Sequence, residues 1–200
     1  DQELLGWIRL ADTPRPESRE AVQRLQALGL EVELLSGDRR EVAEFLGAKW
    51  GITRVRAEVS PEQKLQVVED LEARGARVVM VGDGLNDAPA LARASVGVAM
   101  GQGADVAKAS ASLTLLRDDP RVVAAAIETA RATRDTIRQN LAWAFGYNAI
   151  TLPLAALKIL HPAVAAGAMA MSSVIVVANS LRLRRRPKTD AKPLPEAQGQ

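Results

Sequence analysis

The hydrophobic positions divide the chain into two parts with different patterns. In residues 1–121, short apolar or β-branched runs alternate with longer segments whose apolar side chains recur at helical spacing. The predicted strands cover residues 4–10, 32–35, 54–59, 77–81, 96–100 and 113–116. The predicted helices cover residues 16–28, 39–50 and 61–74, with a short helix from residue 87. Strands that alternate with helices predict an α/β domain with a parallel sheet, in which ligands bind at the carboxyl ends of the strands.

The pattern changes after residue 121. Residues 122–138 are amphipathic and predict a stalk helix, whereas 139–157 and 163–181 contain no charged side chain. Each uncharged segment is long enough to cross a hydrocarbon core of roughly 30 Å. Two buried helices of a larger soluble core are the alternative, but basic residues on both flanks favour a membrane hairpin. The flanking residues are Arg131, Arg134, Arg138, Arg182, Arg184, Arg185, Arg186 and Lys188.

Charge and composition then fix the expected surroundings. Positively charged flanks of membrane helices are retained in the cytoplasm, so the α/β part and the basic tail of residues 182–200 are expected there. The tail is predicted to be disordered. The basic cluster is interpreted as an anchor that sets the membrane topology. An aromatic content of 3% argues against side chains that stack on nucleic-acid bases. Membrane lipid, and not nucleic acid, is therefore the expected partner. The chain has no cysteine and one histidine, His161, which excludes thiolate and multi-histidine sites within it. An integral protein of the plasma membrane is expected.

Residues 82–89, with the sequence GDGLNDAP, carry the strongest chemical signal. They directly follow a predicted apolar strand and precede a helix. Asp83 and Asp87 on such a loop can hold Mg²⁺ with few protein ligands, and the glycines let the backbone approach a phosphate closely. An ordinary turn with a helix cap is the alternative.

Two earlier signals have the same ambiguity. Ser36, Gly37 and Asp38 end a predicted strand, where a hydroxyl and a free N–H can bind phosphate oxygens, although an N-cap at Asp38 explains them equally well. Lys64 is either a solvated surface lysine or a cation that reaches the same phosphate. The order Ser36, Lys64, Asp83 and Asp87 favours the phosphate interpretation.

These motifs together resemble the haloacid dehalogenase-like phosphotransfer core. The string MVGDGLNDAPALA at residues 80–92 is similar to the P-type ATPases, as are ADTPRPESREAVQRLQALGLEVELLSGD and AEVSPEQK. The resemblance covers residues from about 4 to 185 and implies an incomplete, Rossmann-like phosphorylation domain over residues 1–121, followed by a two-helix transmembrane hairpin. In that family ATP phosphorylates an aspartate in an Asp-Lys-Thr-Gly motif on the first core strand. That motif is absent here, so upstream domains of the same protein are expected partners.

The resemblance also implies residue roles. Asp83, with Asp87 beside it, resembles the Mg²⁺ site, and Asn86 resembles the residue that bonds the transferred phosphoryl group. Ser36, Gly37 and Asp38 match a family Thr-Gly-Asp, with serine keeping the hydroxyl. The residues implied to catalyse the reaction or to contact the nucleotide phosphate are Ser36, Gly37, Asp38, Lys64, Gly84 and Asn86.

The predicted membrane helices hold a thioether and several polar groups. The Met169 thioether suits a soft monovalent ion such as Cu⁺, and polar groups in membrane helices are often functional. The alternative is that Asn148, Ser172 and Ser173 only hold helices together and that Met169 packs against lipid.

This pattern resembles the copper type of heavy-metal P-type ATPases, which carry Tyr-Asn in one helix and Met-x-x-Ser-Ser in the next. It implies that Tyr147, Asn148, Met169 and Ser173 bind the transported Cu⁺, with Ser172 as a further contributor. The zinc/cadmium type has a lysine in the first helix and an aspartate in the last, and neither uncharged segment contains one. The copper type also has a Cys-Pro-Cys in an earlier helix, which this chain does not contain.

The sequence therefore predicts the carboxyl-terminal part of a transporter that exports Cu⁺ through an aspartyl-phosphate intermediate, with ATP and Mg²⁺. Three alternatives are transport of Zn²⁺, Cd²⁺ or Ag⁺ by the same family, a membrane-tethered haloacid dehalogenase-like phosphatase, and a catalytically inert chain. The 200 residues alone are expected to be inactive.

Overall fold

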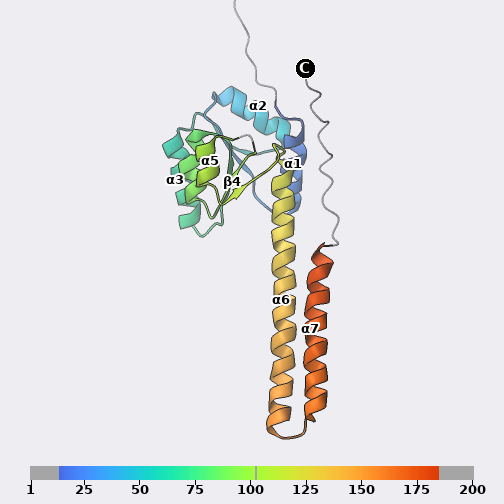
Figure 1. Cartoon of the computed structure of the whole chain (residues 1–200). Coiled ribbons are helices and arrows are strands. Elements are labelled where there is room, and N and C mark those ends of the chain that lie inside the picture. Colours follow the sequence, from blue (N-terminus) through green and yellow to red (C-terminus); the bar gives the residue numbers. More distant parts are fainter. Residues whose placement is uncertain (1–13, 102, 185–200) are drawn as a thin grey trace, which may run out of the picture. The chain divides into compact units, whose positions relative to one another are not determined.

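The computed structural model describes residues 14–101 and 103–184 (Figure 1). The chain forms two compact units, Asp1–Ala124 and Ala125–Gln200. The predicted strand at 4–10 and the tail from residue 185 lie outside the described residues.

The first unit alternates short parallel strands with helices. Its helices are α1 (Glu17–Ala27), α2 (Arg40–Trp50), α3 (Pro61–Ala73), α4 (Ala88–Arg93) and α5 (Asp105–Ser110). Its strands are β1 (Glu33–Leu35), β2 (Arg54–Arg56), β3 (Val79–Gly82), β4 (Val96–Ala99) and β5 (Leu113–Thr114). β1 pairs with β2 in one parallel sheet, and β3, β4 and β5 follow one another in a second. The predicted parallel α/β organisation is confirmed, although the strands are shorter than expected and α5 was not predicted.

Local sequence sets the ends of α3. Ser60 accepts a hydrogen bond from the Gln63 N–H while the Gln63 side chain accepts from the Ser60 N–H, which satisfies two donors that the first turn leaves free. Pro61 at the first helical position has no N–H to lose. Gly75 follows the helix with φ +86°, a conformation that side chains with a Cβ rarely adopt.

Small side chains let α4 pack closely on the three-stranded sheet. Val68 of α3 is buried with Ala90 and Ala94, and Met80 of β3 packs against them. A Cβ on Gly97 would lie 2.2 Å from the Leu91 carbonyl oxygen, so only glycine fits where β4 passes under α4. The core thereby fixes the backbone at the end of β3, where the predicted phosphate loop begins.

Ion pairs join α1 and the residues just before it to the start of helix α6 (Arg121–Ala156) and the residues just before that helix. Arg15 pairs with Asp118 at 2.5 Å. Arg121 reaches Asp119 at 2.9 Å and Glu20 of α1 at 3.1 Å. Burial raises the pKa of the Asp119 carboxyl, but hydrogen bonds from Arg121 outweigh burial and hold this pKa below its usual value.

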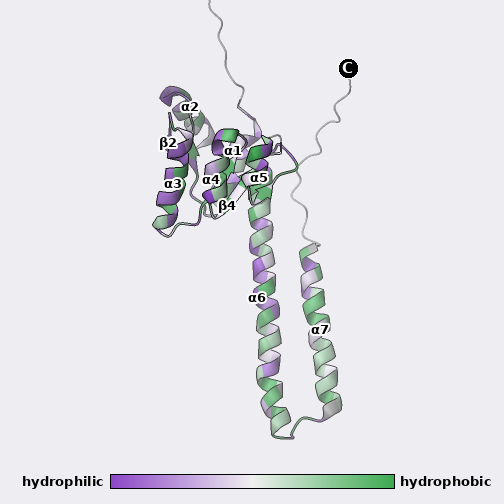
Figure 2. Cartoon of the chain, turned by 60° about the vertical axis from the view of Figure 1, so that its left-hand side comes forward, coloured by the Kyte–Doolittle hydropathy of each residue, from purple (hydrophilic) through white to green (hydrophobic). Residues whose placement is uncertain are grey.

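The second unit consists of the rest of α6 and helix α7 (Pro162–Arg184). The predicted stalk and first membrane segment are one uninterrupted helix, so the boundary at residue 138 is not marked by a break. Figure 2 shows apolar residues along α7 and the later part of α6. Among the described residues, one segment, Ala163–Leu183 of α7, is long and apolar enough to span a membrane by length and composition. Segment 139–157 does not meet that criterion, and its membrane crossing stays a prediction.

The apolar side chains of the second unit are largely uncovered. Trp143, Phe145 and Ile150 of α6 and Val164 and Val177 of α7 are each more than half exposed, at 58–70%. Apolar surface of this extent is stable against lipid or other helices and not against water. The predicted lipid environment is consistent with this surface.

The depressed pKa of Asp119 predicts a pH dependence of stability. Its stabilising contribution is complete above the unfolded-state pKa of about 3.9 and is lost as the pH falls through the lower folded-state value. Asp119→Asn should therefore flatten the acid loss of stability, measured as the urea midpoint of the first unit by pulse proteolysis between pH 7 and pH 3. The control Asp105→Asn alters a fully exposed carboxylate and should leave the acid slope unchanged. An unchanged slope in Asp119→Asn would contradict the assignment.

Candidate functional site

The loop after β3 is built around the Asp87 carboxylate. The Asp87 N–H donates to the Gly84 carbonyl at 3.2 Å and closes a short 3₁₀ turn, Leu85–Asp87. A Cβ on Gly82 would lie 2.7 Å from Asp87 Oδ2, so glycine is required where the strand meets this carboxylate. Asp87 does not cap α4, since no side-chain cap hydrogen bond is present, and the interpretation as a simple turn with a helix cap does not describe the loop.

Lys64, which lies on α3, contacts the Asp87 carboxylate of this loop. Its Nζ lies 2.7 Å from Asp87 Oδ1, and the two side chains are 14% and 12% exposed. Lys64 is therefore not a solvated surface lysine. The pair fixes α3 against the loop and partly neutralises the Asp87 charge, which leaves Asp83 as the exposed carboxylate of the loop.

Backbone hydrogen bonds hold Asp83 from the other side. The Ala104 N–H donates to the Asp83 carbonyl at 2.8 Å, and the Met100 N–H donates to the Gly82 carbonyl at 3.0 Å. These bonds fix the main chain at the carboxyl end of β3 while the Asp83 side chain faces solvent. Asn86 is also exposed on the same turn.

Ser36 and Asp38 form a second small cluster after β1. Ser36 Oγ donates to Asp38 Oδ2 at 2.7 Å and accepts from the Asp38 N–H at 3.2 Å. The Glu58 and Val59 N–H groups donate to the Asp38 and Ser36 carbonyls at 2.9 and 3.0 Å, which holds the loop in place. Helix α2 begins at Arg40 with no side-chain cap, so the N-cap role considered for Asp38 is not observed.

The structure thus gathers the predicted residues into two groups and not one. Lys64, Asp87 and the glycine loop form one group at β3, and Ser36, Gly37 and Asp38 form the other at β1. No hydrogen bond or ion pair between the two groups is found in the parts of the chain that the structure describes. Both groups follow the carboxyl ends of parallel strands, the edge at which such folds bind ligands.

The donor set at β3 fits Mg²⁺. Residues 14–101 and 103–184 hold no cluster of three or more His, Cys, Asp or Glu side chains that would form an all-protein metal cage. Mg²⁺ does not require such a cage, because it is usually bound by one or two carboxylates together with waters and substrate phosphate oxygens. The exposed Asp83 carboxylate provides such a ligand, whereas Asp87 is engaged by Lys64.

Arg15 is a residue that the sequence analysis did not single out. Its hydrogen bond to Asp118 is the main cause of a raised pKa of its guanidinium, and the negative charge of Asp83 contributes as well. Arg15 is therefore within electrostatic reach of the candidate Mg²⁺ ligand. Arg15 lies just before α1 within the string ADTPRPESREAVQRLQALGLEVELLSGD quoted above, and this place in a family motif could have identified it as a candidate.

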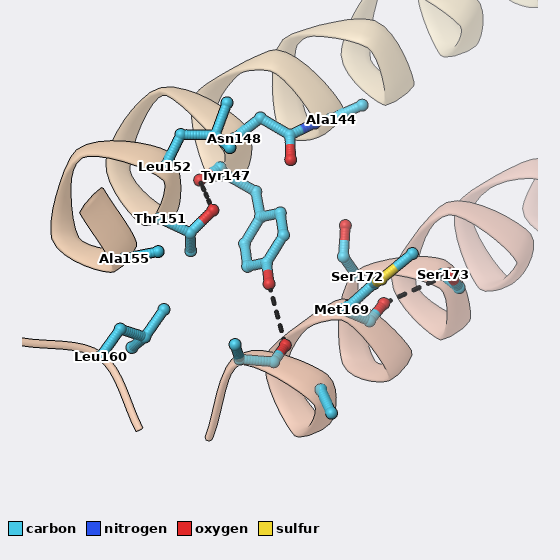
Figure 3. Close-up of a pocket in the computed structure, with 12 residues that line it drawn as sticks. Ala144, Tyr147, Asn148, Thr151, Leu152, Ala155, Leu160, Met169, Ser172 and Ser173 are labelled. Carbon is cyan, nitrogen blue, oxygen red and sulfur yellow. Dashed lines mark hydrogen bonds between the residues drawn. The ribbon is translucent and has the colours of Figure 1, made fainter. Parts of the chain in front are cut away.

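A pocket of about 420 Å³ lies between α6 and α7 within the second unit (Figure 3). It is lined by all four residues predicted to bind the transported ion, Tyr147, Asn148, Met169 and Ser173, and also by Ser172. The other lining residues are Ala144, Thr151, Leu152, Ala155, Leu160, Ala165 and Ala166.

The polar groups of the pocket differ in how far they are engaged. Tyr147 Oη donates to the Ala165 carbonyl at 3.1 Å, and Ser173 Oγ donates to the Met169 carbonyl of its own helix at 3.2 Å. The Asn148 amide and the Ser172 hydroxyl form no hydrogen bond among the described residues, and Ser172 is half-buried toward α6. The pocket contains no carboxylate, so its donor set is one thioether with neutral oxygens.

Comparisons with known proteins bear on both units. The family model of haloacid dehalogenase-like hydrolases matches residues 1–95. The copper-exporting P-type ATPases of Bacillus subtilis (strain 168) and Mycobacterium tuberculosis (strain ATCC 25618 / H37Rv) are 48% and 49% identical over 185 residues. These matches cover 92% of the chain and 23% and 24% of the relatives, so the chain spans about a quarter of their length.

A solved structure matches across most of the chain. The crystal structure of a zinc-transporting PIB-type ATPase in its E2.Pi state has a TM-score of 0.81 and 38% identity, covering 87% of this chain and 28% of that one. The catalytic domain of the CPx-ATPase CopB-B matches 58% of the chain, with a TM-score of 0.56 and 38% identity.

The Lys64–Asp87 pair gives a testable prediction of stability. Lys64→Met should lower the free energy of unfolding of the first unit by about 3 kcal/mol, because it leaves a mostly buried carboxylate unpaired. Adding Asp87→Asn should recover much of that loss, which urea unfolding read by pulse proteolysis would measure. Lys108→Met, which breaks a pair with an exposed Asp105, should cost less than about 0.5 kcal/mol. Equal losses in Lys64→Met and Lys108→Met would refute the structural importance of the pair.

Proposed function

This chain belongs to the P-type ATPases, and we propose that it forms the carboxyl-terminal part of a transporter that uses ATP to export Cu⁺. One observation carries the proposal: Tyr147, Asn148, Met169 and Ser173, predicted from two separate motifs, line one pocket. The copper-exporting relatives, which match both units over 92% of the chain, support the same substrate.

The loop groups of the first unit would act on the phosphoryl group. Lys64 would offset the negative charge of that group, and Ser36, Gly37 and Asn86 would donate hydrogen bonds to its oxygens. Gly84 would let the main chain approach closely. Asp83 would hold Mg²⁺, which when bound would neutralise charge on the transferring phosphate. The phosphorylated aspartate would belong to a part of the protein outside this chain.

Asp87 would have an indirect role in this scheme. Its ion pair with Lys64 orients the ammonium group and keeps the loop closed on Gly82. The Asp38 N–H, which donates to Ser36 Oγ, would hold that oxygen in place while the hydroxyl turns its single proton from Asp38 Oδ2 to the phosphate. Asp87 therefore positions a phosphate-binding donor, and the main chain at Asp38 positions another.

The chemistry of the pocket favours a soft monovalent cation. A thioether binds Cu⁺ well, and a site without carboxylates gives a doubly charged ion such as Zn²⁺ no compensating negative charge. Silver has the same ligand preferences as Cu⁺. The pocket would provide part of the site, and helices upstream of this chain would supply the remainder.

The proposal places both ends of the second unit at the cytoplasmic face of the plasma membrane. α7 holds a segment that can span the bilayer, and the lysine and arginine residues lie at its carboxyl end and on α6 before residue 139. The first unit and the basic tail would then be cytoplasmic. The continuous helix α6 would pass movements of the first unit to the pocket.

The Mg²⁺ assignment predicts a loss of phosphorylation. In the complete transporter, Asp83→Asn should abolish the ATP-dependent phosphoenzyme at ordinary Mg²⁺ concentrations, because the exposed carboxylate ligand is removed. Acid-stable labelling from γ-labelled ATP would measure it, with binding of Cu⁺ retained. Asp105→Asn, another exposed aspartate of the first unit, is the matched control. Normal phosphorylation in Asp83→Asn would disprove the assignment.

The pocket predicts the metal dependence. Met169→Leu should raise the Cu⁺ concentration for half-maximal ATP hydrolysis about tenfold, corresponding to about 1.4 kcal/mol of lost binding. Met171→Leu is the matched control, because Met171 is equally exposed on α7 but does not line the pocket. A similar response in both variants would rule out a specific thioether ligand, and activation by Zn²⁺ instead of Cu⁺ would overturn the choice of metal.

A further inference from the structure

Four polar residues link α6 and α7 away from the pocket. Asn179 Nδ2 donates to Asn140 Oδ1 at 2.9 Å and to Gln139 Oε1 at 3.2 Å. Asn140 Nδ2 donates to Ser180 Oγ at 3.0 Å. We call Gln139, Asn140, Asn179 and Ser180 the amide clamp. None of the motifs described above includes it as a unit.

The clamp differs from the other polar groups of these helices. Thr129, Thr133, Thr136 and Thr151 each donate to a carbonyl four residues earlier in α6, and Ser173 does so in α7. Those hydroxyls form their hydrogen bonds within one helix, so they do not fix the position of the other helix. The amides of the clamp bond across to the other helix, and Asn140 and Asn179 are half-buried there.

The clamp joins the two helices on one side of the pocket. A second cross-helix bond, from Tyr147 to the Ala165 carbonyl, lies at the pocket itself. Ala144 and Ala165 line the pocket, and such small side chains interlock little with the facing helix. The axial position of Met169 relative to Asn148 therefore depends on these bonds, three of which belong to the clamp.

We propose that the amide clamp sets the register of α7 on α6, and thereby holds Met169 and Ser172 level with Tyr147 and Asn148 for metal binding. Asn140 and Asn179 are positioning residues in this role and do not touch the ion. Slippage by one helical turn would move α7 by about 5.4 Å and carry the thioether out of the pocket. The inference rests on the proposed function, since it assigns the clamp to the same metal site.

This role makes a kinetic prediction that simple helix adhesion does not. If only a fraction of molecules has the correct register, the apparent metal affinity falls by that fraction while the bound state works normally. In the complete transporter, Asn140→Leu and Asn179→Leu should each raise the Cu⁺ concentration for half-maximal ATP hydrolysis about tenfold. The maximal rate per phosphorylatable molecule and the KM for ATP should stay unchanged.

Further variants distinguish a change in helix register from a general loss of folding. The double variant Asn140→Leu/Asn179→Leu should shift the Cu⁺ dependence by less than the sum of the two single variants, because both single changes break the shared Asn140–Asn179 bond. Asn179→Gln keeps a carboxamide and should recover much of the affinity, and Ser180→Ala, which loses one bond, should show a smaller shift. Thr136→Val is the matched control, one turn before Asn140 and half-buried, with its hydroxyl bonded only to its own helix.

The outcomes distinguish this inference from the function on which it rests. Unchanged Cu⁺ dependence in both leucine variants, with a normal Cu⁺ response in the unmodified protein, would overturn the clamp. A fall in maximal rate at constant Cu⁺ dependence would show a purely structural contact and would also overturn it. Absence of any Cu⁺ response in the unmodified protein would instead overturn the proposed function.

Discussion

The contact between Lys64 and Asp87 is the constraint on which the first unit depends. It joins α3 to the loop after β3 across 23 residues of sequence and places both charges where solvent hardly reaches. Because an unpaired charge in such a place is costly, neither side chain can move without the other. The close approach of Gly82 to Asp87 and the alanine packing of α4 hold the same loop from its other sides. The loop that results is preorganised, with its one exposed carboxylate at Asp83.

The second unit differs, because its large apolar side chains are mostly exposed among the residues that the structure describes. Its two helices expose many large apolar side chains, and the hydroxyls of Thr133 and Ser173 bond within their own helices. Specific contact between the helices therefore depends on few groups, the amides of the clamp and the Tyr147 hydroxyl. A surface of this kind suits a medium of lipid and neighbouring helices, in which hydrogen bonds and close packing, and not the hydrophobic effect, select the partner.

Much of the fold could be predicted from the sequence, because its signals are local. Ser60, Pro61 and Gly75 mark the ends of α3 within one or two residues, and uncharged segments mark the two long helices. The six-residue helix α5 was missed because a segment so short has too few apolar repeats to reveal its period. The boundary between stalk and membrane was predicted from charge and leaves no trace in the backbone, because helical hydrogen bonds continue through it.

The candidate site was predictable in its residues but not in its pairings. The motifs identified Lys64, Asp83 and Asp87 from residue types, yet only the tertiary structure shows that Asp87 binds Lys64 and that Asp83 stays exposed. Arg15 and the amide clamp depend on contacts between residues 39 to 103 positions apart, for which one sequence offers no signal.

The length of α6 has a mechanical consequence. Its 36 residues span about 54 Å at 1.5 Å per residue, whereas the hydrocarbon core is about 30 Å thick. In the proposed transporter, some 24 Å of this helix would therefore extend beyond the bilayer core as a rigid lever. A tilt of about 10° about one end would displace the other end by roughly 9 Å, given that rise. Ångström-scale rearrangements around a phosphate could in this way be amplified into displacements larger than a metal ion.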